Sequence, residues 1–167
     1  MITSGALQLG QDADRFSINE VRLGQDYPAA LAAAEQQFGR AAVCEAEKAG
    51  NQRNKMASLQ QTCIFEELRG VTLAEQEILQ AQYQFGNGKL QQVDFEIKAS
   101  DETAGEKLIG AISEALGMAV EQQGPMNSWV GANDAVLLVR QGNYRLRIVN
   151  RLLLPDDADY SRITPRS

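Results

Sequence analysis

The chain's two thiols belong to Cys44 and Cys63, and each lies in a segment that is predicted to be a β-strand. Neighbouring antiparallel strands hold paired Cα atoms about 4.5–5.5 Å apart, which is within the range that a disulfide accepts. We therefore predict a Cys44–Cys63 disulfide, the alternative being two unrelated buried thiols. Such a bridge closes a loop of about 20 residues and stabilises the fold by about 3 kcal/mol.

A disulfide places the chain in an oxidising compartment, so the sequence predicts a periplasmic or secreted protein. No leader is visible, because Met1 to Gly10 has neither a basic start nor a long apolar stretch. No run of residues approaches the ~18 apolar residues that cross a bilayer, so we expect no transmembrane segment.

The residues that support catalysis are missing. There are 0 histidines, which excludes imidazole as a base, acid or metal ligand. Two cysteines without histidine cannot complete a tetrahedral zinc site, and neither a nucleophile motif nor a phosphate-binding loop is present. Adjacent carboxylates such as Glu66 and Glu67 point to opposite faces of a strand and do not form a catalytic pair. We expect no catalytic residue, no metal, no cofactor and no enzyme activity.

Charge is distributed unevenly along the chain. The net charge of -6 argues against nucleic acid as a partner, yet residues 140–167 hold six arginines against three aspartates. The alternating segments 135–140 and 144–151, joined by a tight Gly142-Asn143 turn, predict a hairpin in which Arg140 lies opposite Arg145. Arg147 then shares their face. Such a patch could receive carboxylates or phosphates of a partner, the alternatives being internal ion pairs and simple solvation.

Several further side chains are candidates for binding. On the same hairpin Val136, Leu138 and Val149 are expected to face outward, covered by the chain's own arm or tail or serving as a protein contact. Trp129 and Tyr144 are aromatic candidates, although a lone tryptophan after a glycine-rich loop is also typical of a core. Glutamines alternate along two predicted strands, which fits a solvated sheet face or a polar ligand; they are Gln80, Gln82, Gln84, Gln91 and Gln92.

Two helices are predicted from their apolar stripes. The first begins after Asp26, carries Tyr27, Leu31, Ala34 and Phe38 at helical spacing, and ends at Gly39. The second begins near Ser100 or Asp101 and ends at Gly117, with its stripe formed by Leu108, Ile112, Ala115 and Leu116.

Alternating or apolar segments predict antiparallel strands, which are 17–23, 41–47, 59–68, 78–85, 89–99, 135–140 and 144–151. Between the strands 78–85 and 89–99 a three-residue loop, Gly86-Asn87-Gly88, would pair Phe85 with Lys89 and Ala81 with Val93. That register puts both apolar sets on one face.

The predicted fold class is therefore α+β, with two helices packed on antiparallel sheet. We expect an irregular N-terminal arm over 1–16, one domain over 17–151 and a polar C-terminal tail over 152–167. Each helix ends in an aromatic or leucine followed by glycine and precedes strands, which suggests two related halves, 17–99 and 100–151, or convergent helix ends.

Helices that end in Phe38-Gly39 or Leu116-Gly117, a cysteine pair on the following strands, and the Tyr83-Gln84-Phe85 hairpin resemble a group of small secreted envelope domains. These are the β-lactamase-inhibitor-protein-like and outer-membrane-assembly-lipoprotein-E-like domains. The resemblance covers most of residues 17–151 through element order, and it implies a non-enzymatic role in binding other proteins. No lipid-attachment cysteine stands at the start, so a lipid anchor is not implied.

Together these observations predict a non-catalytic protein-interaction module of the bacterial cell envelope, whose protein partner has an acidic surface. Its candidate binding residues are Arg140, Arg145, Arg147, Tyr144 and Trp129. The alternative is a small-molecule or glycan binder with a groove near Trp129 and Tyr144.

Overall fold

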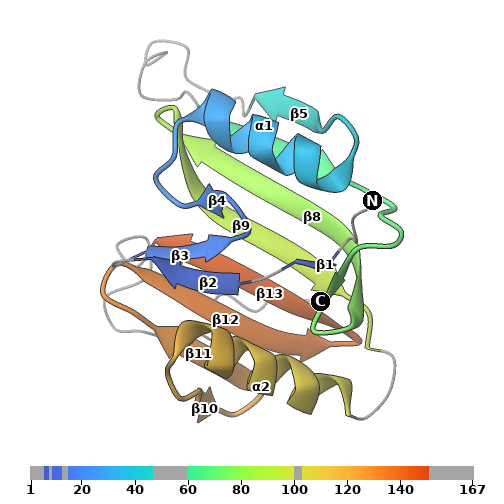
Figure 1. Ribbon diagram of the computed structural model, residues 1–167, viewed down its shortest axis with the longest axis vertical. Coiled ribbons are helices and arrows are strands. Elements are labelled where there is room, and N and C mark those ends of the chain that lie inside the picture. Colours follow the sequence, from blue (N-terminus) through green and yellow to red (C-terminus); the bar gives the residue numbers. More distant parts are fainter. Residues whose placement is uncertain (1–5, 8, 13–14, 47–59, 100–102, 151–167) are drawn as a thin grey trace.

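The computed structural model describes residues 6–7, 9–12, 15–46, 60–99 and 103–150. These residues form two helices and a mostly antiparallel set of strands, so the predicted α+β class is confirmed. Figure 1 shows both helices and a small three-stranded sheet on one face of a large ten-stranded sheet. We call this face the front face and the opposite one the rear face. Within the described ranges, no helix is long and apolar enough to cross a membrane.

The large sheet contains ten strands, which are β1 (Ala6–Leu7), β5 (Val43–Ala46), β6 (Gln60–Phe65), β7 (Thr72–Leu73), β8 (Gln76–Gly86), β9 (Lys89–Ile97), β10 (Glu121–Gln123), β11 (Met126–Val130), β12 (Asp134–Gln141) and β13 (Asn143–Asn150). Their order is β1-β7-β8-β9-β13-β12-β11-β10, with β6 also paired to β8 and β5 paired to β6. The small sheet contains β2 (Leu9–Asp12), β3 (Arg15–Ile18) and β4 (Val21–Arg22). Apart from the parallel pair β1–β7, the described strands pair antiparallel.

Helix α1 spans Tyr27–Phe38 and helix α2 spans Ala104–Leu116. Both end as predicted, since Gly39 and Gly117 each adopt the left-handed conformation at φ 69°. Asp26 precedes α1, but its carboxylate accepts a 2.8 Å hydrogen bond from Lys89 Nζ and does not cap the helix. The stripe of α2 differs from the prediction at Ala115, which is exposed, and its predicted start at 100–101 lies outside the described residues.

The β8–β9 hairpin corrects the predicted turn. Gly86 pairs with Lys89 across a two-residue turn, in which Asn87 (φ 55°) and Gly88 (φ 78°) are both left-handed. Turns of this kind match the twist of a hairpin, so the two-residue loop is favoured over the predicted three-residue loop. A bulge between Gln84 and Phe85 then shifts the register, and Tyr83 meets Val93. The apolar sets do share one face, as expected, but the bulge produces this result and the turn does not.

The register of the β12–β13 hairpin also differs from the predicted one. Its turn leaves Gln141 opposite Asn143, so Arg140 lies opposite Tyr144 and Leu138 opposite Leu146. The prediction of a two-residue Gly142-Asn143 turn, with Arg140 opposite Arg145, was wrong by one position. Because side chains alternate between faces, this slip exchanges the two faces of β12.

The exchange of faces changes part of the outward set that was expected on this hairpin, in which Val149 keeps its place while Val136 and Leu138 do not. Val136 and Leu138 belong to the main core, whereas Leu137 and Val139 lie on the rear face with Val149.

Residues near the N-terminus form more regular structure than the expected irregular arm. They contain β1, β2 and the start of β3, and β3 is fixed to the large sheet by a 2.9 Å hydrogen bond from the Phe16 N–H to Asp134 Oδ2. Strands β7, β10 and β11 were also not anticipated. The expected polar tail over 152–167 lies outside the described residues.

The predicted disulfide is confirmed. Cys44 on β5 and Cys63 on β6 are direct partners in the antiparallel register, with their Cα atoms 3.9 Å apart and their sulfurs bonded. The bridge ties the edge strand β5 to the interior of the sheet.

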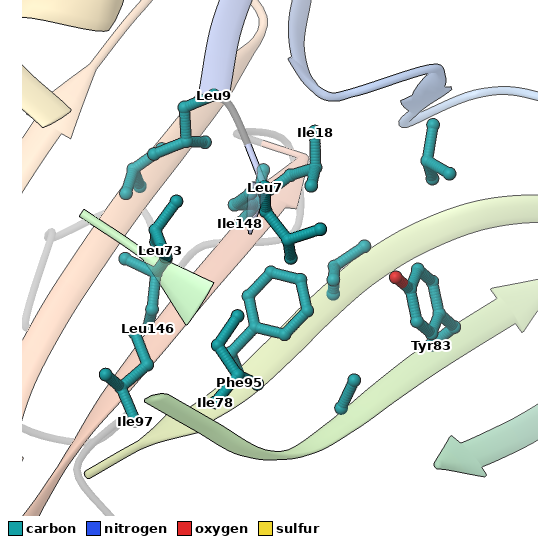
Figure 2. Packing of buried hydrophobic residues seen from close by; sticks show 14 of the residues in the cluster. Leu7, Leu9, Ile18, Leu73, Ile78, Tyr83, Phe95, Ile97, Leu146 and Ile148 are labelled. Atoms are coloured by element: carbon teal, nitrogen blue, oxygen red, sulfur yellow. The ribbon is translucent and has the colours of Figure 1, made fainter. Parts of the chain in front are cut away.

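The main core lies between the front face and the elements that cover it, and Figure 2 shows part of its packing. Within it Tyr83 is fully buried against three aromatic rings, those of Phe38, Phe65 and Phe95. Burial raises the pKa of the Tyr83 hydroxyl well above its usual range, and the nearby Gln37 amide offsets only part of the increase. Among the described residues, no polar atom meets this hydroxyl with good hydrogen-bond geometry.

We expect Tyr83 to make the protein less stable in alkali. Its hydroxyl ionises near pH 10 in the unfolded chain but stays neutral in the folded one, so stability is full below that pH and falls as the pH rises above it. The loss approaches about 1.4 kcal/mol per pH unit. Urea unfolding of the wild type and Tyr83→Phe between pH 8 and about 11 measures it, with the smaller alkaline loss expected for the variant. Parallel curves for the two proteins would contradict this expectation.

Candidate interaction surface

Arg140 and Tyr144 pair across the β12–β13 hairpin. The Arg140 guanidinium lies 5.6 Å from the centre of the Tyr144 ring, a favourable cation–π arrangement. The Tyr144 hydroxyl packs so closely on α2 that a Cβ at Gly105 would collide with it. Tyr144 is therefore a packing residue that holds α2, and only the exposed Arg140 is presented to solvent here.

Arg145 and Arg147 lie on the other side of the hairpin, on the rear face. Arg147 Nε donates a 2.8 Å hydrogen bond to Asp94 Oδ1, in an ion pair whose side chains are 31% and 18% exposed. Arg145 is exposed, and among the described residues its guanidinium makes no ion pair or hydrogen bond. Its register partner Glu96 instead accepts a 3.0 Å hydrogen bond from Asn143.

The three arginines therefore do not form the single patch that the sequence suggested. The register places Arg140 on the front side and Arg145 with Arg147 on the rear, and Asp94 neutralises Arg147. Arg145 is the one arginine of the three that reaches the rear face without a counter-charge bonded to it.

Trp129 occupies the core. Its side chain is 1% exposed, and its indole N–H donates a 3.0 Å hydrogen bond to Ser113 Oγ on α2. With Tyr144 also buried, neither ring lines an open groove, so the geometry does not support a glycan platform at these residues.

The rear face has a polar half that spans β5, β6, β8, β9 and β13. The antiparallel registers align the side chains in rows across the strands, and one such row runs Val43, Ile64, Gln82, Asp94 and Arg147. The next row contains Glu45, Thr62, Gln84 and Gln92, and the Gln92 amide donates a 2.9 Å hydrogen bond to Asp94. These side chains are half-buried or exposed, and the described helices lie on the other face (Figure 1).

This polar half offers amide donors and acceptors, one neutralised ion pair and one free guanidinium on the surface of the sheet. Such a surface can bind another protein through many weak polar contacts. In the part of the chain that the structure describes, no group of three or more acidic or cysteine side chains could hold a metal ion.

A cavity of about 250 Å³ lies elsewhere, between α2 and the N-terminal strands. Its lining is apolar except for Glu114 and includes Leu7, Leu73 and Ile112. It contains none of the expected binding residues.

Part of this polar surface could be predicted from the sequence. The alternation of Gln80, Gln82 and Gln84 predicted a wet face of β8 correctly. Asp94 was missed, because its importance depends on β9 and β13 being neighbours, and they are separated by a helix and three strands in the sequence.

Comparisons of this chain with protein-family models, with curated proteins and with solved structures find no match in any of the three.

We expect Arg147→Gln and Arg145→Gln to differ in stability. The first removes a partly buried ion pair and should lower the free energy of unfolding by about 1 kcal/mol, less in high salt. The second removes an exposed, unpaired charge and should change it by less than about 0.5 kcal/mol. Urea unfolding at low and high salt measures both, and equal effects of the two substitutions would refute the pairing.

Proposed function

We propose that this chain is a non-catalytic protein-interaction module of the bacterial cell envelope, and that it binds its partner through the polar half of the rear face. One observation carries the proposal. Across five strands this half is not covered by any described helix, and it presents the exposed, unpaired guanidinium of Arg145.

The shape and chemistry of the polar half favour a protein partner. Its side chains lie in a broad sheet face, where a second surface can contact many of them at once. A carboxylate of the partner would form a charge-assisted, two-point hydrogen bond with Arg145, so an acidic partner surface fits best. The element order that resembles secreted envelope domains agrees with this role.

The disulfide supports the envelope location. Cys44–Cys63 bridges paired strands, and such bonds persist in oxidising compartments such as the periplasm. We therefore propose a periplasmic or secreted protein.

We also infer that the two halves of the domain are related. Helix α1 precedes β5, β6, β8 and β9, and α2 precedes β10, β11, β12 and β13, apart from the short β7. Both helices end with a glycine N–H bonded to the carbonyl four residues earlier, of Glu35 and of Ser113. The last strand of each half, β9 and β13, meets the other at the centre of the sheet.

Site-specific photo-crosslinking tests the partner surface. A benzophenone amino acid at Gln82 on the rear face should yield a protein adduct in living cells of the source bacterium. The same group at Gln36, an exposed position on α1, should not. Arg145→Glu should reduce the Gln82 adduct at least about tenfold, because a like charge then opposes the partner's carboxylates. An absent Gln82 adduct, or equal adducts at both positions, would rule out this surface.

Thiol labelling tests the location. In cells treated with a membrane-permeant alkylating reagent before lysis, Cys44 and Cys63 should remain unmodified until a reductant is added, and the chain should be released with the periplasmic or extracellular fraction. A version retained in the cytoplasm serves as the control and should be alkylated without reductant. Free thiols in the native chain would remove the support for an envelope role.

A further inference from the structure

The cavity beside helix α2 is large enough to be a ligand site. Its volume is about 250 Å³, and it lies between α2 and the strands β1, β2 and β7. An apolar cavity of about 150 Å³ is enough to hold benzene in another protein. The cavity beside α2 therefore has room for one aromatic ring together with a short chain.

The inner wall of the cavity is apolar. It contains Leu7, Leu9, Leu73 and Ile112, whose side chains are at most 8% exposed and come from four different elements. Figure 2 shows the three leucines among the packed residues. All four side chains belong to the main core, so the cavity lies on the front side of the large sheet. An apolar group that enters it leaves water for an apolar surrounding, which is favourable.

Small and charged side chains of α2 form the outer part of the lining. Ala111 is half-buried, whereas Glu114 and Ala115 are exposed, so the cavity reaches solvent along this side of the helix. Glu114 is the one charged residue among the described residues of the lining. No described residue forms an ion pair or a hydrogen bond with its carboxylate. The cavity thus combines an apolar interior with one unpaired negative charge at its edge.

The turn between β7 and β8 lies against the cavity in an unfavourable backbone conformation. Its two residues, Ala74 and Glu75, are both left-handed, at φ 53° and φ 68°, and Ala74 lines the cavity. This region of φ is disfavoured for residues other than glycine, asparagine and aspartate. The Gln76 amide donates a 3.2 Å hydrogen bond to the Ala74 carbonyl and so helps to hold the turn. Strained residues of this kind concentrate at ligand sites, which agrees with binding in this cavity.

We propose that this cavity binds a small apolar primary amine in its protonated form. The apolar part of the ligand contacts the leucines and Ile112, and its ammonium group donates a charge-assisted hydrogen bond to Glu114. An anionic ligand of the same shape is repelled by Glu114, and none of the described lining residues is basic. The site lies on the front side of the sheet, so it does not depend on the partner proposed for the polar half of the rear face.

Methyl NMR titrations of the full chain test the proposal with three ligands of similar shape. 2-Phenylethylamine carries an ammonium group at neutral pH, 2-phenylethanol a hydroxyl group and 3-phenylpropanoate a carboxylate. The amine should shift the methyl signals of Leu7, Leu73 and Ile112 in a saturable manner. Its affinity should exceed that of the alcohol about fivefold, and that of the carboxylate by more. No saturable shift with the amine, or equal affinity for all three ligands, would overturn the proposal.

Substitutions in α2 locate the binding. Glu114→Gln should remove the advantage of the amine over the alcohol and leave the affinity for the alcohol unchanged. Ala111→Leu should fill the cavity and abolish binding of both ligands, and Ala115→Leu is a second filling variant at a more exposed position. Ala32→Leu, at an exposed position on α1, is the matched control and should bind both ligands as the wild type does.

The methyl signals of Leu90 and Val93, which do not line the cavity, report whether each variant is folded. Undiminished binding of the amine by a folded filling variant would overturn the proposal, because the amine would then bind elsewhere.

Discussion

The pairing of β9 with β13 holds the whole sheet together. Each of these strands is the last of its helix-plus-strands group, and their contact is the one that joins the two groups into a continuous sheet. On the front face it sets Phe95 beside Leu146, within the main core. On the rear face it sets Asp94 beside Arg147, whose ion pair occupies the same junction. A single strand pair thus unites the core and positions the polar surface.

The two faces of the sheet show how one backbone supports different surfaces. Side chains that alternate along a strand are divided between a dry front face, covered by α1, α2 and the small sheet, and a rear face with a polar and an apolar half. On the front face Trp129 and Tyr144 are committed to packing against α2. The side chains of the polar half of the rear face take no part in that packing.

The hairpins explain where sequence reasoning succeeded and where it failed. Alternation identified the strands and the shared apolar face of β8 and β9, because burial of one face is a property of each segment by itself. The registers were wrong in both hairpins, by a bulge at Gln84–Phe85 and by the turn around Gly142. Bulges and turn types depend on the twist of the sheet and on the strands beyond the hairpin. A register change of one residue in the β12–β13 hairpin placed Arg140 on the opposite face from Arg145 and Arg147.

The sequence by itself determined the two helices with their glycine ends, the disulfide and the lack of imidazole chemistry. These follow from local geometry, from the spacing of two thiols and from composition, none of which needs a distant partner. Only the tertiary structure decided that Arg147 is neutralised by Asp94, that Arg145 is not, and that Trp129 is buried. Each of those outcomes depends on which strands become neighbours in the sheet. The strand order is determined by the packing of the whole chain.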